Sequence, residues 1–142
     1  KLLLQSQPAV AIFGEKDLQQ LLVLRAMVRD LDIPVEIIGA PIIRESDGLA
    51  MSSRNAYLNA EQRQIAGQLN GILARLATSG LPVEQAEAQA RDALLAAGFG
   101  TVDYAALRDA HDLQAIGAQT TSRRALIAAR LGDIRLIDNM SA

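Results

Sequence analysis

The chain has 142 residues, of which 50% are hydrophobic, 21% are charged and only 3% are aromatic. This composition is typical of one ordinary globular domain or two small ones, with a core built from Leu, Ile, Val and Ala. The formal net charge of −2 leaves no broad basic surface for nucleic acid. No apolar run is long enough for a membrane span, and the lack of cysteine excludes disulfides and thiolate chemistry and favours a cytoplasmic location.

The first expected element is a short buried strand of a parallel sheet, over the apolar residues 9–13 and ending before Gly14. A helix is expected over residues 17–31, with Asp17 as its N-cap. The turn between them would present free N–H groups and the positive end of a helix dipole, both of which favour an anion, and Lys16 adds a charge there. The alternative is that Lys16 is a solvated loop charge and Asp17 only a cap.

A second polar segment, residues 47–55, reads Asp-Gly-Leu-Ala-Met-Ser-Ser-Arg-Asn. Gly48 permits a tight approach of the backbone. Beyond it, Ser52, Ser53 and Arg54 place two hydroxyls, adjacent N–H groups and a guanidinium in one loop, a combination suited to phosphate oxygens. The local alternative is that one of the two serines caps a short helix that follows. The two interpretations are compatible with each other.

A second strand is expected over residues 34–39, so that strand, helix and strand form a βαβ unit with a parallel pair. The next stretch, residues 40–50, contains Pro41 and Gly48 among mixed charges and connects two substructures. We place a domain boundary near Ile42.

Beyond the boundary, the chain predicts an α+β domain. Asn59 and Gln62 form a capping-box start for a helix that continues to Ser79, with apolar residues at helical spacing. The elements expected after it are a helix over residues 83–97 and three strands over residues 101–107, 125–129 and 134–137. The last two strands are joined by a short turn and form an antiparallel hairpin.

Three further groups of polar residues have a functional and a structural interpretation. Glu36 could mark a site, Asp138-Asn139 could be catalytic and Arg123-Arg124 could bind an anion, but we favour the structural interpretation of each. Glu36 lies within an apolar strand and is interpreted as an edge-facing carboxylate. Asp138 and Asn139 are interpreted as a turn that caps the end of the last strand. The pair Arg123-Arg124 is interpreted as a solvated sheet edge, where two positive charges discourage the addition of another strand.

Three blocks of the chain, residues 13–20, 41–55 and 135–139 (FGEKDLQQ, PIIRESDGLAMSSRN and RLIDN), resemble the pantothenate synthetase, or pantoate–β-alanine ligase, family. That family belongs to a nucleotidyltransferase superfamily related to class I aminoacyl-tRNA synthetases. The resemblance implies an α/β fold with the C-terminal part of a Rossmann-like nucleotide-binding domain over residues 1–41. It implies a small α+β domain with an antiparallel sheet over residues 42–142, which closes over the active site.

In that family, pantoate attacks the α-phosphate of ATP to give pantoyl adenylate and pyrophosphate, and the amine of β-alanine then displaces AMP. The resemblance thus implies ATP as a substrate, Mg²⁺ on its phosphates and a homodimer as the complete enzyme. The family's early H-x-G-H motif has no counterpart here, and the single histidine, His111, is interpreted as a solvated surface residue. The chain is therefore expected to be the C-terminal portion of the enzyme, inactive without its N-terminal half. The alternative is a noncatalytic nucleotide-binding or interaction module.

The resemblance also implies roles for individual residues. Four of them match catalytic positions at the phosphates of ATP: Lys16, Ser52, Ser53 and Arg54. Gly14 and Asp17 match positions near the ribose, and Gln20 matches one that hydrogen-bonds pantoate. Ile43 and Met51 match positions whose backbone groups meet the edge of the adenine.

Overall fold

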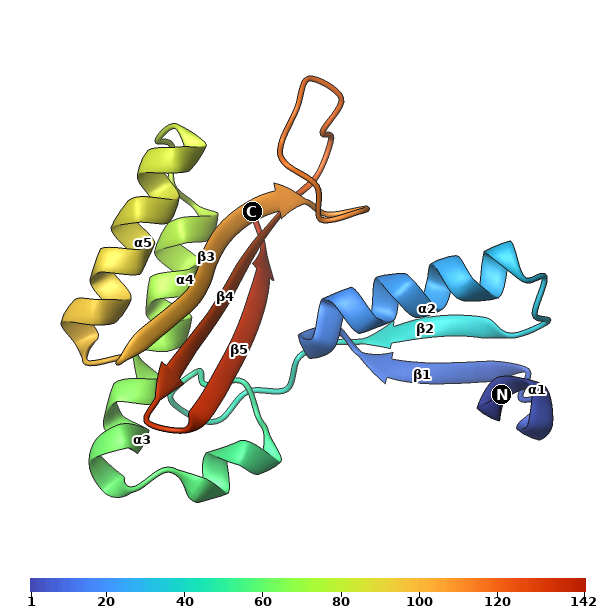
Figure 1. Ribbon diagram of the computed structural model, residues 1–142, viewed down its shortest axis with the longest axis horizontal. Helices are drawn as coiled ribbons and strands as arrows, with labels where there is room; N and C mark the ends of the chain where they lie inside the picture. The colour runs from blue at the N-terminus through green and yellow to red at the C-terminus, as the bar shows by residue number, and fades with distance from the viewer. The chain divides into compact units, whose positions relative to one another are not determined.

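The computed structural model describes residues 1–142 and contains two compact units, residues 1–42 and residues 43–142. The elements of the first unit are α1 (Leu2–Ser6), β1 (Val10–Gly14), the 3₁₀ turn η1 (Glu15–Asp17), α2 (Leu18–Asp30) and β2 (Glu36–Ala40). The two strands are parallel, with Val10 opposite Glu36, and α2 runs alongside them (Figure 1). The predicted βαβ unit is thereby confirmed.

The strand β1 is less buried than its apolar sequence predicts. Leu18 and Leu21 of α2 are buried, and residues of the strands alternate between half-buried and exposed. Ile12, for instance, is 66% exposed, because α2 covers only one face of the two-stranded sheet. The expectation of a fully buried strand was therefore wrong for this chain.

The start of α2 also differs from the prediction. Asp17 occupies the N-cap position, but its side chain makes no capping hydrogen bond. Its backbone, at φ −89° and ψ 59°, departs from the extended conformation that aims an N-cap side chain at the first turn. The 3₁₀ turn η1 leads into the helix instead, so the side chain of Asp17 is not used as a cap.

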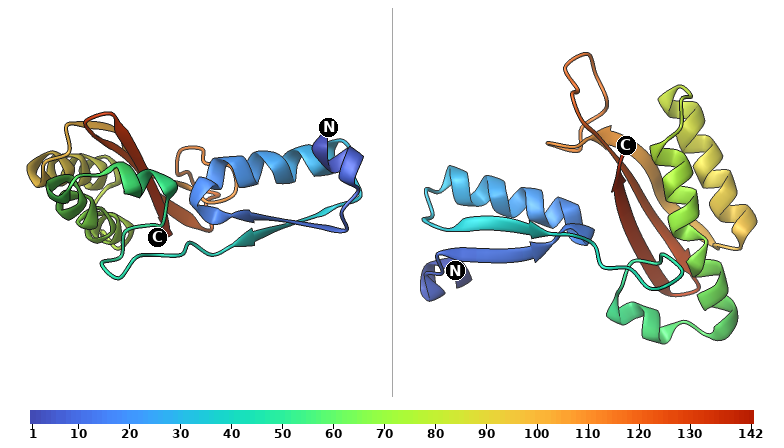
Figure 2. Two further views of the ribbon diagram at one scale, coloured as in Figure 1. Left: turned by 90° about the horizontal axis from the view of Figure 1, so that it is seen from below. Right: turned by 180° about the vertical axis from the view of Figure 1, so that it is seen from behind.

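The second unit is the predicted α+β domain. Its elements are the 3₁₀ turn η2 (Ser53–Tyr57), α3 (Ala60–Gly67), α4 (Leu69–Ala77), α5 (Val83–Ala97), β3 (Thr101–Asp109), β4 (Arg123–Leu131) and β5 (Ile134–Ser141). The strands form one antiparallel sheet in the order β3-β4-β5, with a tight turn between β4 and β5. The helices α4 and α5 lie together on one face of this sheet (Figure 2).

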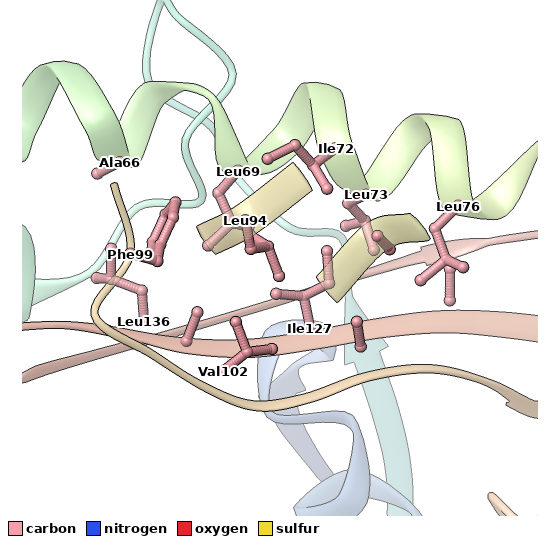
Figure 3. Close-up of a cluster of buried hydrophobic side chains, with 14 of the residues drawn as sticks. Ala66, Leu69, Ile72, Leu73, Leu76, Leu94, Phe99, Val102, Ile127 and Leu136 are labelled. Atoms are coloured by element: carbon pink, nitrogen blue, oxygen red, sulfur yellow. The ribbon is translucent and has the colours of Figure 1, made fainter. Parts of the chain in front are cut away.

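The core of the second unit lies between these helices and the sheet. Leu69, Leu73, Leu94 and Ile127 are fully buried there and come from α4, α5 and β4 (Figure 3). Burying a side chain of this size contributes roughly 1.5–3 kcal/mol relative to leaving it in water. This aliphatic core, which needs almost no aromatic residue, gives residues 43–142 a rigid base for the loops at its surface.

The helix expected from Asn59 to Ser79 is in fact two helices. The capping box of Asn59 and Gln62 is present, but α3 ends at Gly67 and α4 begins at Leu69. A Cβ at Gly67 would lie 2.7 Å from Oδ2 of Asp47, so a carboxylate from a distant loop approaches the backbone here. Glycine favours the break, since it is among the weakest helix formers.

Two interpretations of polar residues were wrong. Asp138 and Asn139 do not form a turn but lie inside β5, where both are 2% exposed. Arg123 and Arg124 begin the central strand of the sheet rather than an edge strand, and Arg124 donates a hydrogen bond of 2.8 Å to Oδ1 of Asn139. Glu36 is exposed, as expected for an edge-facing carboxylate.

None of the helices in the chain has both the length and the apolar character required to cross a membrane.

Candidate functional site

Four of the predicted site residues lie together at the carboxyl end of β1. Gly14 is the last residue of the strand, Lys16 and Asp17 are in the 3₁₀ turn, and Gln20 is in the first turn of α2. Ligands of open parallel sheets bind outside the carboxyl ends of the strands. The first unit therefore brings a cation, a carboxylate and an amide to the edge where a ligand is expected.

Gly14 has no internal reason to be glycine. Its φ is −69°, which any residue adopts, and a Cβ there would meet no atom within 4 Å. Gly39 is different, because a Cβ at that position would lie 2.9 Å from Cδ2 of Leu21. The space next to Gly14 is thus open within this chain and leaves room for a ligand at the end of β1.

The second unit carries the rest of the predicted site in a small hairpin, residues 43–51, and in the serine loop that follows it. Arg44 and Ala50 form an isolated antiparallel bridge, and the N–H of Met51 donates a hydrogen bond of 2.9 Å to the carbonyl of Ile43. The turn of the hairpin needs Gly48, whose φ is +89°. The close approach that this glycine permits is made by Asn70, whose Nδ2 would lie 2.5 Å from an added Cβ.

The pairing of Ile43 with Met51 leaves one donor and one acceptor unused. Only the Met51 N–H to Ile43 carbonyl bond is made, so the N–H of Ile43 and the carbonyl of Met51 have no hydrogen bond within the chain. Both side chains are largely exposed, at 66% and 51%. A donor and an acceptor from the same residue pair can hydrogen-bond the edge of a planar ring that offers the complementary pattern.

The serine loop follows directly. Oγ of Ser52 accepts a hydrogen bond of 3.3 Å from the N–H of Arg54, which confirms the capping contact for this serine. Ser53 and Arg54 are exposed, and their side chains make no hydrogen bond or ion pair within the chain. A hydroxyl and a guanidinium are therefore available to an anionic ligand beside a serine that fixes the backbone.

Sequence reasoning missed the group that anchors the hairpin. Nη1 and Nη2 of Arg44 donate hydrogen bonds of 2.6 and 3.1 Å to the two carboxylate oxygens of Asp138, whose side chain is 0% exposed. Nη1 also donates to the carbonyl of Gly48 at 2.9 Å. Both charged residues lie in blocks that resemble the family, but they are 94 positions apart and no local signal pairs them.

Two further contacts fix the far side of the hairpin. Arg63 forms an ion pair with Asp47, and its hydrogen bond lowers the pKa of that carboxyl below the ordinary value. Nδ2 of Asn55 donates a hydrogen bond of 3.2 Å to the carbonyl of Ala50. Oδ1 of Asn55 is buried without a partner in the chain. Asp47 and Asn55 are thus committed to internal contacts, although they lie in the same motif as Ser53 and Arg54.

The chain has no group of three or more His, Cys, Asp or Glu side chains that could hold a metal ion. Its side chains do not fit a metal site of their own, so no metal ligand is assigned.

Comparison with known proteins gives consistent results. The family model described as pantoate–β-alanine ligase matches residues 1–141. A pantothenate synthetase of Caulobacter vibrioides is 56% identical over 147 residues, which span 99% of this chain and 52% of that relative. The crystal structure of pantothenate synthetase from Thermus thermophilus superposes with a TM-score of 0.88 at 44% identity, over 98% of this chain and 51% of that one.

A second solved structure, pantoate–β-alanine ligase from Francisella tularensis complexed with β-γ ATP and β-alanine, has a TM-score of 0.74 at 28% identity. The match covers 99% of this chain and 46% of that protein. The chain therefore spans about half the length of the relatives that it matches.

Proposed function

Because this chain belongs to the pantoate–β-alanine ligase family, we propose that it forms the C-terminal half of an enzyme that joins pantoate and β-alanine at the expense of ATP. The family match over residues 1–141 is the observation that carries the proposal. The open space beside Gly14 and the uncommitted side chains of Ser53 and Arg54 support it.

The proposed reaction has two steps. A carboxylate oxygen of pantoate bonds to the α-phosphorus of ATP, the bond from that phosphorus to the bridging oxygen breaks, and pyrophosphate leaves. The neutral amine of β-alanine then attacks the acyl carbon, the bond from that carbon to the AMP oxygen breaks, and the nitrogen loses a proton. Both steps release a phosphate-bearing leaving group, so preorganised cations and N–H donors would lower the barriers.

We assign these cations and donors to the phosphates of ATP: Lys16, Ser52, Ser53 and Arg54. A hydrogen-bond donor or cation that is held next to the charge formed in the transition state typically lowers the barrier by about 3–4 kcal/mol. Arg54 can bind two phosphate oxygens at once through its planar fork, whereas an ammonium acts as a point charge. Mg²⁺ enters the proposal only as a counter-ion carried by the triphosphate of the substrate, since the chain gathers no metal ligands of its own.

The remaining assignments concern the rest of the substrates. Gly14 and Asp17 are proposed near the ribose, and Gln20 is proposed to hydrogen-bond pantoate. The free N–H of Ile43 and the free carbonyl of Met51 are proposed to bind the adenine edge, where N1 accepts and the N6 amino group donates. The exposed side chains of Asp17 and Gln20 make no hydrogen bond within the chain and so remain available for these contacts.

A fusion tests this proposal directly. The 142-residue chain is joined to the half of the Caulobacter vibrioides relative that it does not match, and the purified fusion is assayed for AMP release that depends on both pantoate and β-alanine. We expect activity from the fusion and none from the chain alone. A fusion that folds and binds ATP but forms no pantothenate would instead support a noncatalytic nucleotide-binding module.

The Lys16→Ala variant of the fusion separates a phosphate contact from a solvated charge. It should slow single-turnover adenylate formation by about 10²-fold or more and leave pantoate binding nearly unchanged. Arg29→Ala is the matched control, since it removes an exposed cation from the far end of α2. Unchanged adenylation by Lys16→Ala would remove this residue from the site.

Three wider features of the proposal follow from family membership alone. The complete enzyme is proposed to be a cytoplasmic homodimer, which analytical ultracentrifugation and cell fractionation test. Closure of residues 42–142 over the bound nucleotide stays a prediction, and ATP-dependent protection from limited proteolysis would support it.

A further inference from the structure

The buried ion pair between Arg44 and Asp138 has no role in the reaction as proposed, yet several hydrogen bonds hold it within the second unit. The guanidinium holds both carboxylate oxygens of Asp138 and also the carbonyl of Gly48. The carboxylate in addition accepts a hydrogen bond of 2.8 Å from the N–H of Asn139. Replacing such a pair by apolar residues is often neutral or stabilising, so stability alone does not account for it.

The position of Arg44 within the hairpin indicates what the pair holds in place. Arg44 bridges Ala50, and the neighbouring pair is Ile43 with Met51. Because side chains alternate along extended backbone, Arg44 points inward to β5 while Ile43 and Met51 point to solvent. The guanidinium thus fixes one arm of the hairpin to the central body of the unit and, through Gly48, fixes the turn as well.

We propose that the Arg44–Asp138 pair is a positioning device for base recognition, an inference that rests on the proposed function. The pair holds the N–H of Ile43 and the carbonyl of Met51 at the spacing and direction that an adenine edge requires. Neither charged group touches the nucleotide. The planar, bidentate contact between Arg44 and Asp138 sets the orientation of the hairpin. A lysine in place of Arg44, or an amide in place of Asp138, cannot reproduce this contact.

The proposal predicts a loss of base selectivity rather than a general loss of activity. Hypoxanthine presents a donor at N1 and an acceptor at position 6, the reverse of adenine, so a rigid Ile43–Met51 pair accepts ATP and rejects inosine triphosphate. In the fusion enzyme, Arg44→Lys and Asp138→Asn should each lower the ATP-to-ITP ratio of kcat/KM by about tenfold or more, with the KM for pantoate unchanged. The double variant should be little worse than either single one, because the two residues act as a unit.

Arg108→Lys is the control, since it disturbs the ion pair with Glu87 in the same unit but away from the hairpin. It should leave the ATP-to-ITP ratio at the wild-type value. If Arg44→Lys does not fold, Asp138→Asn, which keeps the shape of the carboxylate, provides the measurement.

Three results would overturn the inference: a wild-type enzyme without preference for ATP over ITP, variants with unchanged selectivity, or an equal loss in Arg108→Lys. A wild-type fusion that makes no pantothenate refutes the proposed function instead. In that case, competition between ATP and ITP for the 142-residue chain and its variants still tests the positioning role.

Discussion

Replacing Arg44 with alanine should destabilise the chain more than replacing its partner Asp138. The side chain of Arg44 is 24% exposed, whereas that of Asp138 is 0% exposed. Arg44→Ala leaves a fully buried carboxylate whose only remaining contact is the N–H of Asn139. Asp138→Ala leaves a guanidinium that still donates to Gly48 and can reach water. The alanine substitutions of the two partners should therefore lower the free energy of unfolding by different amounts.

Removing one partner of a buried ion pair costs about 3–5 kcal/mol, because the other charge is left uncompensated. We place Arg44→Ala at the upper end of this range. Asp138→Ala should cost about 2 kcal/mol, the value of charged hydrogen bonds lost where the stranded group remains solvated. For a unit of this size, about 5 kcal/mol corresponds to a fall in Tm of roughly 25 °C.

Urea unfolding of the 142-residue chain, followed by far-UV circular dichroism because the chain has no tryptophan, measures both variants. Arg108→Ala serves as a control, since the side chains of Arg108 and Glu87 are 35% and 24% exposed and neither partner would be stranded in the core. Equal costs for the two alanine variants, or a larger cost for Asp138→Ala, would refute the reasoning from exposure.

Ser52→Ala should lower the free energy of unfolding by about 0.5 kcal/mol, because the capping hydrogen bond from the N–H of Arg54 is long. Ser53→Ala should change it by less than about 0.5 kcal/mol. Both variants of the fusion should lose ATP-dependent turnover, and an active Ser53→Ala enzyme would contradict the phosphate role of that serine. The hydrogen bond from Arg63 lowers the pKa of Asp47 in the folded chain below the ordinary value of 3.8. The ion pair therefore stabilises the fold above pH 3.8, and this stabilisation is lost as the pH falls through the folded pKa. Asp47→Asn should therefore destabilise the chain at about pH 7 and progressively less as the pH falls through the folded pKa. Urea titrations at stepwise lower pH would contradict this if the difference from the wild type stayed constant. Gly14→Ala should keep or slightly raise the Tm but weaken ATP binding measured by calorimetry.

The elements that could be predicted from the sequence are those whose signals are local. The helix α5 covers Val83–Ala97 as expected, because Pro82 precedes it and Gly98, at φ +106°, ends it. The capping box of Asn59 and Gln62 is formed by residues three apart. Each of these features is decided by a few neighbouring residues, so a pattern along the chain contains the physical information needed.

The predictions that failed concern features that depend on residues far apart in the sequence. The break after Gly67 lies where Asp47, a residue 20 positions earlier, approaches the backbone so closely that an added Cβ would be 2.7 Å from its carboxylate. The continuation of β5 through Asp138 depends on Arg44, which supplies the charge that makes a buried carboxylate tolerable. A carboxylate after an apolar strand is typical of a turn, and only the distant partner reverses that expectation. Sequence reasoning therefore did not find Arg44 and Asp138, the distant residues that support the motif.

The polar side chains of residues 47–55 differ in whether they have contacts within the chain, and the sequence alone does not show this difference. The side chain of Asp47 binds Arg63, and Nδ2 of Asn55 donates to the carbonyl of Ala50, while Oδ1 of Asn55 has no partner in the chain. These two contacts hold the loop. Ser53 and Arg54 lie between them and have no partner within the chain. The contacts of Asp47 and Asn55 hold the backbone on both sides of these two residues. The loop backbone is therefore preorganised, whereas the exposed side chain of Arg54 keeps rotamer freedom that it would lose when a ligand binds. A motif that served only to cap a short helix would need Ser52 and would place no constraint on the two residues after it.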